Sequence, residues 1–351
     1  AAFAFALVTG AVAYRGISGS TVMALVINVV QLTALVAFSV LAVAFRFAHP
    51  EAGYAHAGLV SVVLPHSITN VLFQGTIAIL LLVGFESVTA LGAEAIDPHR
   101  DIRRAVLLSL AIQGGAAYLL EYVSANLFVS DASGGYAGAA ASGAPIGDMI
   151  RLIGDRMLGG TGVALALILA LTVLVALIGT TLACLNTGVR ITYVMGRDRE
   201  VPGILGLLHG RFATPHYGVL ALALVSAALG AYGVLSADTL LQIILASNVG
   251  TFLVYGMTNA LVIIAFVHRP ERSALRHVIV PGLGVLANVA MLGAVMALSL
   301  SAGGATQTDT IIAVGIVAGW VVAGAAWLLA NSLMTRRSLL VQPTTRRAAD
   351  A

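Results

Sequence analysis

Residues 80–101 read LLLVGFESVTALGAEAIDPHRD and place a glycine, an aromatic residue, a glutamate and a serine inside an apolar run. In hydrocarbon, non-helical backbone is tolerated only where it is buried in protein or lines a cavity. We therefore predict that residues 83–87 interrupt a membrane helix and that Glu86, an ionisable side chain at membrane depth, marks a functional site. The alternative interpretation is an intact helix in which Glu86 forms hydrogen bonds for structural reasons alone.

The composition identifies the environment of this stretch. The chain has 351 residues, of which 59% are hydrophobic and 9% are charged, whereas about a quarter of the residues of a soluble domain are charged. This balance is typical of a membrane protein. The single cysteine, Cys184, excludes an internal disulfide, and no pair among the eight histidines has the spacing of metal ligands. We expect no metal centre and no cofactor.

Apolar stretches of about 20 residues, the length that crosses a bilayer as a helix, recur along the chain. Eight stretches satisfy this requirement, at residues 21–45, 68–95, 104–130, 161–188, 216–235, 240–267, 277–300 and 309–334. Residues 1–13 are also apolar and begin without an initiator methionine or a charged segment, so we interpret them as the end of a further span. The sequence thus predicts an all-α polytopic membrane protein with about nine transmembrane segments.

The arginines indicate the orientation of the chain, because cytoplasmic loops carry an excess of basic residues. Arg46, Arg151 and Arg156 fall in one set of alternate loops, and the other fifteen basic residues fall in the opposite set. We therefore predict a multi-pass protein of the cytoplasmic (inner) membrane, embedded in the lipid bilayer, with a cytoplasmic C-terminus. Nucleic-acid binding is not expected, because the basic residues are spread over five loops. The fifteen are Arg15, Arg100, Arg103, Arg104, Arg190, Arg197, Arg199, Arg211, Arg269, Arg272, Arg276, Arg336, Arg337, Arg346 and Arg347.

A predicted outer loop contains an amphipathic helix. Residues 145–160 read PIGDMIRLIGDRMLGG, and their apolar side chains recur on one helical face, at Met149, Ile150, Leu152, Ile153 and Met157. Two interpretations stay open at this point. The helix either packs on the membrane bundle as part of a loop or forms a lid over an outward vestibule.

Two motifs resemble those of amino acid permeases in the amino acid, polyamine and organocation transporter superfamily. The segment GFESVTALGAEAIDPHRDIRRAV, residues 84–106, is similar to the sixth helix and following loop of that family, and departs from it at Asp97, His99 and Arg103. The segment NTGVRITYVMGRDREVPGILGLLHGRFATPHYGV, residues 186–219, resembles the eighth helix and its loop, with Arg199 where glycine is common. The two motifs lie far apart in the chain, so the resemblance covers essentially all of it.

The resemblance implies a leucine-transporter-like inverted-repeat fold that is incomplete in this chain. Residues 1–67 would be helices 4 and 5 of the first repeat, residues 68–268 the second repeat with helices 6 to 10, and residues 269–351 helices 11 and 12 with a cytoplasmic tail. Helices 1 to 3 would be missing, so this piece alone is not expected to transport. The missing helices share the side-chain pocket, so the resemblance does not identify the substrate.

The implied function is secondary active transport of an amino acid or related amine by alternating access. The expected coupling ion is a proton, with sodium as the other candidate, and no enzymatic activity is expected. A neutral or apolar substrate is favoured, because Leu80 and Val83 leave the visible half of the pocket apolar. The alternative function is a non-transporting sensor or scaffold built on the permease fold.

The resemblance also assigns roles to individual residues. Carbonyl groups of the helix break, at Val83, Gly84, Phe85, Glu86 and Ser87, would receive the substrate amino group. Glu86 would brace the unwound segment or relay a proton, and Leu80 occupies the place of an aromatic gate in many relatives. Gln31 falls where some proton-coupled relatives carry a lysine, which weakens a lysine-based coupling mechanism.

Two further sets of polar residues lie in predicted spans. In the eighth family helix, hydroxyl and amide groups either supply a sodium-like site or serve helix packing, at Thr180, Thr181, Asn186 and Thr187. In the tenth, polar residues recur at helical spacing and should face the bundle interior, at Ser247, Asn248, Thr251, Tyr255 and Asn259. Of this stripe, Asn248 and Tyr255 are candidate substrate contacts, and the alternative role is sealing this helix against its neighbours.

Overall fold

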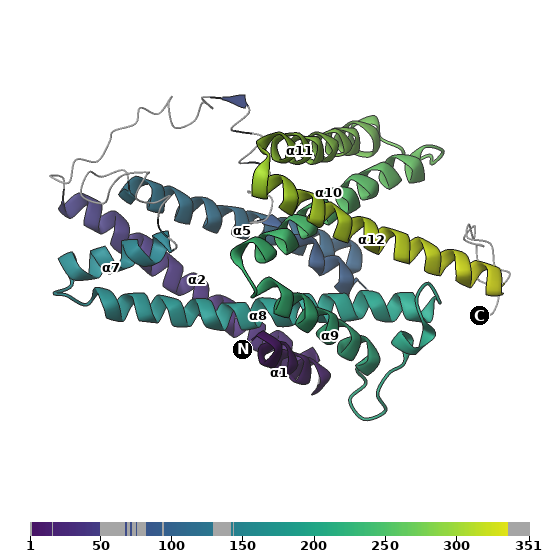
Figure 1. The fold of residues 1–351 in the computed structure, drawn as a ribbon, viewed down its shortest axis with the longest axis horizontal. Helices are drawn as coiled ribbons and strands as arrows, with labels where there is room; N and C mark the ends of the chain where they lie inside the picture. The colour runs from purple at the N-terminus through teal and green to yellow at the C-terminus, as the bar shows by residue number, and fades with distance from the viewer. Residues whose placement is uncertain are drawn as a thin grey trace. The chain divides into compact units, whose positions relative to one another are not determined.

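The computed structural model describes residues 2–15, 17–49, 82–92, 95–128 and 144–335, together with residues 67, 68, 71, 75 and 142. The chain forms two compact units. The first unit is Val8–Thr187, and the second combines Ala1–Leu7 with Gly188–Ala351. Every secondary-structure element formed by the described residues is a helix (Figure 1).

The first unit is built from long helices joined by shorter ones. It contains most of α1 (Ala2–Arg15), then α2 (Ile17–Ala48), the 3-10 helix η2 (Phe85–Leu91), α5 (Pro98–Phe128), α7 (Pro145–Met157) and most of α8 (Gly162–Arg197). Helix α2 packs against both α5 and α7, and α5 packs against η2.

The amphipathic helix α7 packs on the bundle, as one of the two interpretations of its sequence predicts. Pro145 begins the helix at a position where its missing N–H costs nothing. The buried cluster consists of Phe38, Ala42 and Phe45 of α2, Met149, Ile150 and Ile153 of α7, and Leu169 of α8. The described contacts therefore make α7 a packed element of the first unit.

The turn from α7 into α8 brings two glycines together. A Cβ atom added to Gly154 would lie 2.5 Å from the Cα of Gly162. The carboxylate of Asp155 accepts a hydrogen bond of 3.1 Å from the N–H of Gly162. The two helices can approach this closely only because neither glycine carries a side chain.

The second unit contains the C-terminal helices. These are the 3-10 helix η4 (Gly203–Gly206), α9 (His216–Gly233), α10 (Ala237–Phe266), the π-helical turn η5 (Leu275–Ile279), α11 (Val280–Ala302) and α12 (Gly304–Thr335). Helix α10 begins at a capping box, in which Ser236 and Thr239 exchange side-chain to backbone hydrogen bonds. It packs against α9, α11 and α12 and is the central helix of this unit (Figure 1).

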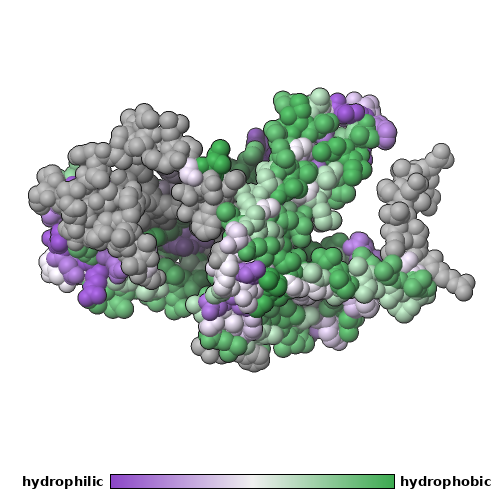
Figure 2. Space-filling view, turned by 45° about the horizontal axis from the view of Figure 1, so that its top comes forward, coloured by the Kyte–Doolittle hydropathy of each residue, from purple (hydrophilic) through white to green (hydrophobic). Residues whose placement is uncertain are grey.

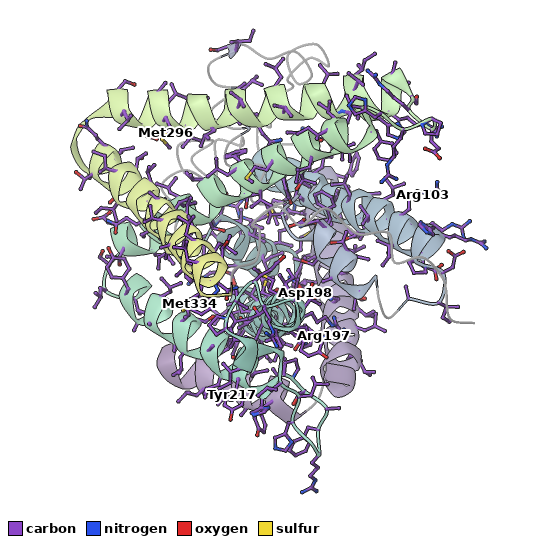
Figure 3. All side chains as sticks on the ribbon, turned by 90° about the vertical axis from the view of Figure 1, so that its right-hand side faces the viewer. Arg103, Arg197, Asp198, Tyr217, Met296 and Met334 are labelled. Carbon is purple, nitrogen blue, oxygen red and sulfur yellow. The ribbon has the colours of Figure 1, made fainter. Side chains whose placement is uncertain are left out.

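A hydrogen bond joins the end of α12 to the turn that follows α8. The side-chain amide of Asn331 donates to the backbone carbonyl of Arg199 over 2.6 Å. Arg199 has a φ angle of 63°, in the left-handed region that favours glycine. Figure 3 shows Arg197 and Asp198 at this turn and Met334 at the end of α12.

The described part of the chain contains six helices that are long and apolar enough to cross a membrane. They correspond, with ends that differ by a few residues, to six of the predicted spans, all except 68–95 and 104–130. Residues 104–128 lie in helix α5, and most of 68–95 lies outside the described residues. Apolar side chains cover long helical surfaces and hydrophilic ones gather near helix ends (Figure 2). The protein is an all-α, multi-pass integral membrane protein, as predicted, whereas the inverted-repeat boundaries stay predictions.

Candidate functional site

The helix break lies at the predicted place. Val83 and Gly84 form a turn, and the 3-10 helix η2 begins at Phe85. Gly84 has a φ angle of 113°, which an L-amino acid rarely adopts. A 3-10 helix of seven residues is longer than usual and exposes backbone groups that an α-helix would pair. The backbone around residue 84 therefore departs from the α-helix that an uninterrupted span would require.

The Glu86 carboxylate braces this turn. The N–H of Gly84 donates a hydrogen bond of 2.9 Å to Oε2 of Glu86. The N–H of Ser87 donates to the carbonyl of Gly84 over 3.0 Å, and the hydroxyl of Thr89 donates to the carbonyl of Glu86 over 2.7 Å. A Cβ atom on Gly84 would meet no atom within 4 Å among the described residues. The backbone at Gly84 is thus both fixed and accessible.

Sequence reasoning missed Gln113 of α5. Its side-chain amide donates a hydrogen bond of 3.4 Å to the carbonyl of Val83, thirty residues earlier in the chain. In the same region, a Cβ atom on Gly114 would lie 3.6 Å from Leu82. The signal in the sequence was a glutamine followed by two glycines inside an otherwise apolar stretch. Helix α5 therefore contacts the break through Gln113 and Gly114.

Helix α8 carries further predicted residues. Thr180, Cys184 and Thr187 share one helical face, because residues three and four apart lie on one side of a helix. Thr181 instead donates its hydroxyl hydrogen to the carbonyl of Leu177 over 2.8 Å, as expected for a packing role.

The remaining predicted residues of the first unit differ in their setting. Asn186 is buried and Thr187 is half-buried. Gln31 of α2 is half-buried, and Leu80 lies outside the described residues. The roles of all these side chains in binding a substrate or an ion stay predictions.

The polar stripe of α10 belongs to the second unit. Asn248 is 4% exposed, and its Oδ1 atom has no hydrogen-bond partner among the described residues. Thr251 donates to the carbonyl of Ser247 over 2.9 Å, and Asn259 donates to the carbonyl of Tyr255 over 2.8 Å. Two side chains of the stripe, Thr251 and Asn259, therefore donate along their own helix, whereas the Oδ1 atom of Asn248 does not accept from it.

No group of three histidine, cysteine or acidic side chains is arranged to hold a metal ion in the part of the chain that the structure describes. The chemistry at the break therefore belongs to backbone carbonyls, one carboxylate and the surrounding apolar side chains. This arrangement can bind a small cationic group and can carry a proton.

Comparison with protein families decides the identity. The model of the amino acid permease family matches residues 1–331. The chain belongs to this family. The family and its transporter relatives place the chain among transport proteins and not among enzymes.

Individual relatives agree with this assignment. A branched-chain amino acid permease (BcaP) of Lactococcus lactis subsp. cremoris is 34% identical over 153 residues, which are 44% of this chain and 30% of the relative. A methylthioribose transporter of Bacillus subtilis is 22% identical over 268 residues, 76% of this chain and 52% of the relative. An uncharacterized transporter of Mycobacterium tuberculosis is 29% identical over 235 residues, 66% of this chain and 48% of the relative. The chain thus spans about half or less of the length of these permease-family relatives.

Proposed function

We propose that this permease moves a neutral, apolar amino acid across the cytoplasmic membrane by alternating access, coupled to a proton. The observation that carries the proposal is the helix break at Gly84 with its braced carboxylate at Glu86. Each carbonyl oxygen of such a break keeps a second lone pair and, together with the negative charge, can accept from an ammonium group, as the ends of half-helices do in other transporters.

The local chemistry favours an apolar amino acid over a cationic one. The Glu86 carboxylate already accepts a hydrogen bond from Gly84, and the carbonyl of Val83 accepts one from Gln113. These groups suit a single ammonium group. The Val83 and Leu82 side chains beside them are apolar. The name of the Lactococcus lactis relative, a branched-chain amino acid permease, supports the same substrate class.

The proposed coupling ion is the proton. Glu86 is the acidic residue of the break, and a carboxylate that hydrogen-bonds to an unwound backbone can release that backbone when it takes up a proton. Sodium is the competing ion, for which Thr180 and Thr187 on the α8 face beside Cys184 would supply hydroxyl oxygens.

The proposed orientation places the C-terminus in the cytoplasm. Basic side chains lie near helix ends, among them Arg103 in the second turn of α5 and Arg197 at the end of α8, and Figure 3 labels both. Such positions agree with the excess of basic residues expected in cytoplasmic loops.

Uptake into proteoliposomes tests the proposal. The full-length protein is given a panel of labelled amino acids, with and without an inward proton gradient and with sodium present or absent. We expect gradient-driven uptake of branched-chain amino acids, lost in Glu86→Gln and retained in the control Glu200→Gln, whose side chain is exposed in the turn after α8. Uptake driven by sodium and not by the proton gradient would make sodium the coupling ion. No uptake by well-folded protein would favour the sensor or scaffold function.

A further inference from the structure

A buried acidic group lies in the second unit, far from the helix break in the sequence. Asp309 of α12 is 4% exposed and is the only ionisable side chain among the buried polar residues that the structure describes. It sits within a helix that is long and apolar enough to span the membrane. A carboxyl group in such a place is costly in its ionised form and by default has a function.

Two neutral side chains connect Asp309 to neighbouring helices. The amide Nε2 of Gln242, in α10, donates a hydrogen bond of 2.8 Å to Oδ1 of Asp309. The hydroxyl of Tyr232, in α9, donates to Oε1 of Gln242. Gln242 is itself buried, whereas Tyr232 is 36% exposed. The chain of bonds therefore begins at the surface and ends at the buried carboxyl group.

No basic side chain of the surrounding helices offsets a charge on Asp309. Helices α9, α10, α11 and α12 contain no arginine or lysine. Their other titratable groups are His216, Tyr217 and Tyr232 on α9 and Asp238 and Tyr255 on α10, while α11 has none. Arg276 and His277 belong to η5, which precedes α11 at the end of that helix far from Gly304. An ionised Asp309 would thus be a buried charge without a cation among these helices.

The start of α12 does not supply the missing positive charge. The dipole of a helix favours carboxylates within its first turn and fades beyond it. Asp309 is the sixth residue of α12, past that turn. The Gln242 amide is its stabilising donor in the described structure.

The geometry points to a proton-binding site formed by Asp309, Gln242 and Tyr232. With Asp309 ionised, Tyr232 donates to Gln242 and Gln242 donates to Asp309, as the structure shows. When a proton binds Asp309, rotation of the Gln242 amide by half a turn lets the new Asp309 hydroxyl donate to Oε1, while Nε2 donates to the Tyr232 oxygen. Every side chain of the set keeps a partner in both states, so neither state leaves a buried polar group unpaired.

A further acidic residue lies near this set in the sequence of α10. Asp238 is exposed in the first turn of α10, and Gln242 lies four residues further on the same helical face. The inference does not depend on transport, because proton binding at Asp309 is a property of the resting protein.

Infrared difference spectroscopy tests this site without any uptake assay. The full-length protein, reconstituted in liposomes, is titrated from alkaline to acidic pH in water and in deuterium oxide. We expect a carboxylic-acid carbonyl band, sensitive to deuterium, that is lost in Asp309→Asn and kept in both Glu86→Gln and Asp238→Asn. A spectrum of Asp309→Asn that superimposes on that of the unmodified protein at every pH would overturn the proposal.

A second variant covers the case in which Asp309→Asn does not fold. Tyr232→Phe keeps the carboxyl group and removes the outer hydrogen bond, so the carbonyl band should persist with a shifted frequency and a shifted titration midpoint. A band with unchanged frequency and midpoint in Tyr232→Phe would show that the network does not bind the proton and would also overturn the proposal. Loss of uptake alone bears on the proposed function and not on this site.

Discussion

The N–H of Gly84 donates a hydrogen bond of 2.9 Å to the carboxylate of Glu86, two residues later in the chain. The glutamate therefore closes a turn around the glycine whose φ angle is 113°. One side chain both carries the charge of the break and holds the backbone of the break in place. A change in the protonation of Glu86 would act directly on the backbone that we propose to contact the substrate.

The charge and the hydrogen bond of Glu86 can be separated by substitution. Glu86→Gln keeps an oxygen that accepts from Gly84, whereas Glu86→Leu removes the acceptor and with it a hydrogen bond that contributes about 0.5–1.5 kcal/mol. We expect Glu86→Leu to lower the thermal transition of the purified protein well below that of Glu86→Gln. Equal transitions for the two variants would show that the bond does not stabilise the turn.

Gly84→Ala should destabilise the break through the backbone alone. No described atom lies within 4 Å of an added Cβ, so the cost is the left-handed conformation, about 1–3 kcal/mol. The matched control is Gly115→Ala in α5, where the added Cβ also meets nothing within 4 Å and the backbone is helical. Alanine should be neutral or stabilising there, by about 0.5–1 kcal/mol. Thermal unfolding in detergent measures the difference, and a similar effect of both substitutions would contradict the prediction.

Gly154→Ala should loosen α7 from the first unit. An added Cβ would lie 2.5 Å from the Cα of Gly162, and such overpacking costs about 1–3 kcal/mol. The control in the same helix is Gly147→Ala, whose Cβ would make an ordinary contact of 3.6 Å with Ala144. Limited proteolysis should release fragments near α7 faster in Gly154→Ala only. If the control is cleaved equally fast, the close glycine contact does not hold the helix.

The contact between α10 and α11 offers a third test of glycine packing. A Cβ atom on Gly284 would lie 2.7 Å from the side-chain amide of Asn259. We expect Gly284→Ala to lower the thermal transition and the added substitution Asn259→Ala to restore most of it. The control Gly282→Ala meets nothing within 4 Å in the same helix. Failure of Asn259→Ala to rescue would place the strain elsewhere.

Asn248 distinguishes a binding role from a packing role. Its buried Oδ1 atom has no partner in the described residues, so a leucine of similar size should not lower stability, since an unpaired buried acceptor itself costs about 1–3 kcal/mol. We expect Asn248→Leu to keep or raise the thermal transition while uptake falls. A lower transition with unchanged uptake would mean that Asn248 serves helix packing.

Residues close together in the chain could be predicted well. The break at Gly84 follows from a glycine and a glutamate set in an apolar run, because an ionisable side chain is costly in hydrocarbon and glycine tolerates left-handed backbone. The buried face of α7 follows from its helical periodicity, and Met149, Ile150 and Ile153 are fully packed, as predicted. These features depend on local chemistry that a sequence displays directly.

Pairings between distant residues could not be predicted. Gln113 and Val83 are thirty residues apart, and Gln242 and Asp309 are sixty-seven apart, so nothing in either segment indicates its partner. Helix ends were also less predictable than helix positions. Residues 161–188 were predicted from hydropathy, but α8 continues to Arg197, because the chain stays helical after it stops being apolar.

The hydrogen bond between Asn331 and Arg199 gives the end of α12 a mechanical role. A swing of the adjoining end of α8 must either carry the last turn of α12 with it or break this bond. One hydrogen bond therefore couples the end of α12 to the turn after α8, although the two bonded residues are 132 positions apart in the chain. The last turn of α12 and the turn after α8 are therefore tied to one another in the described structure.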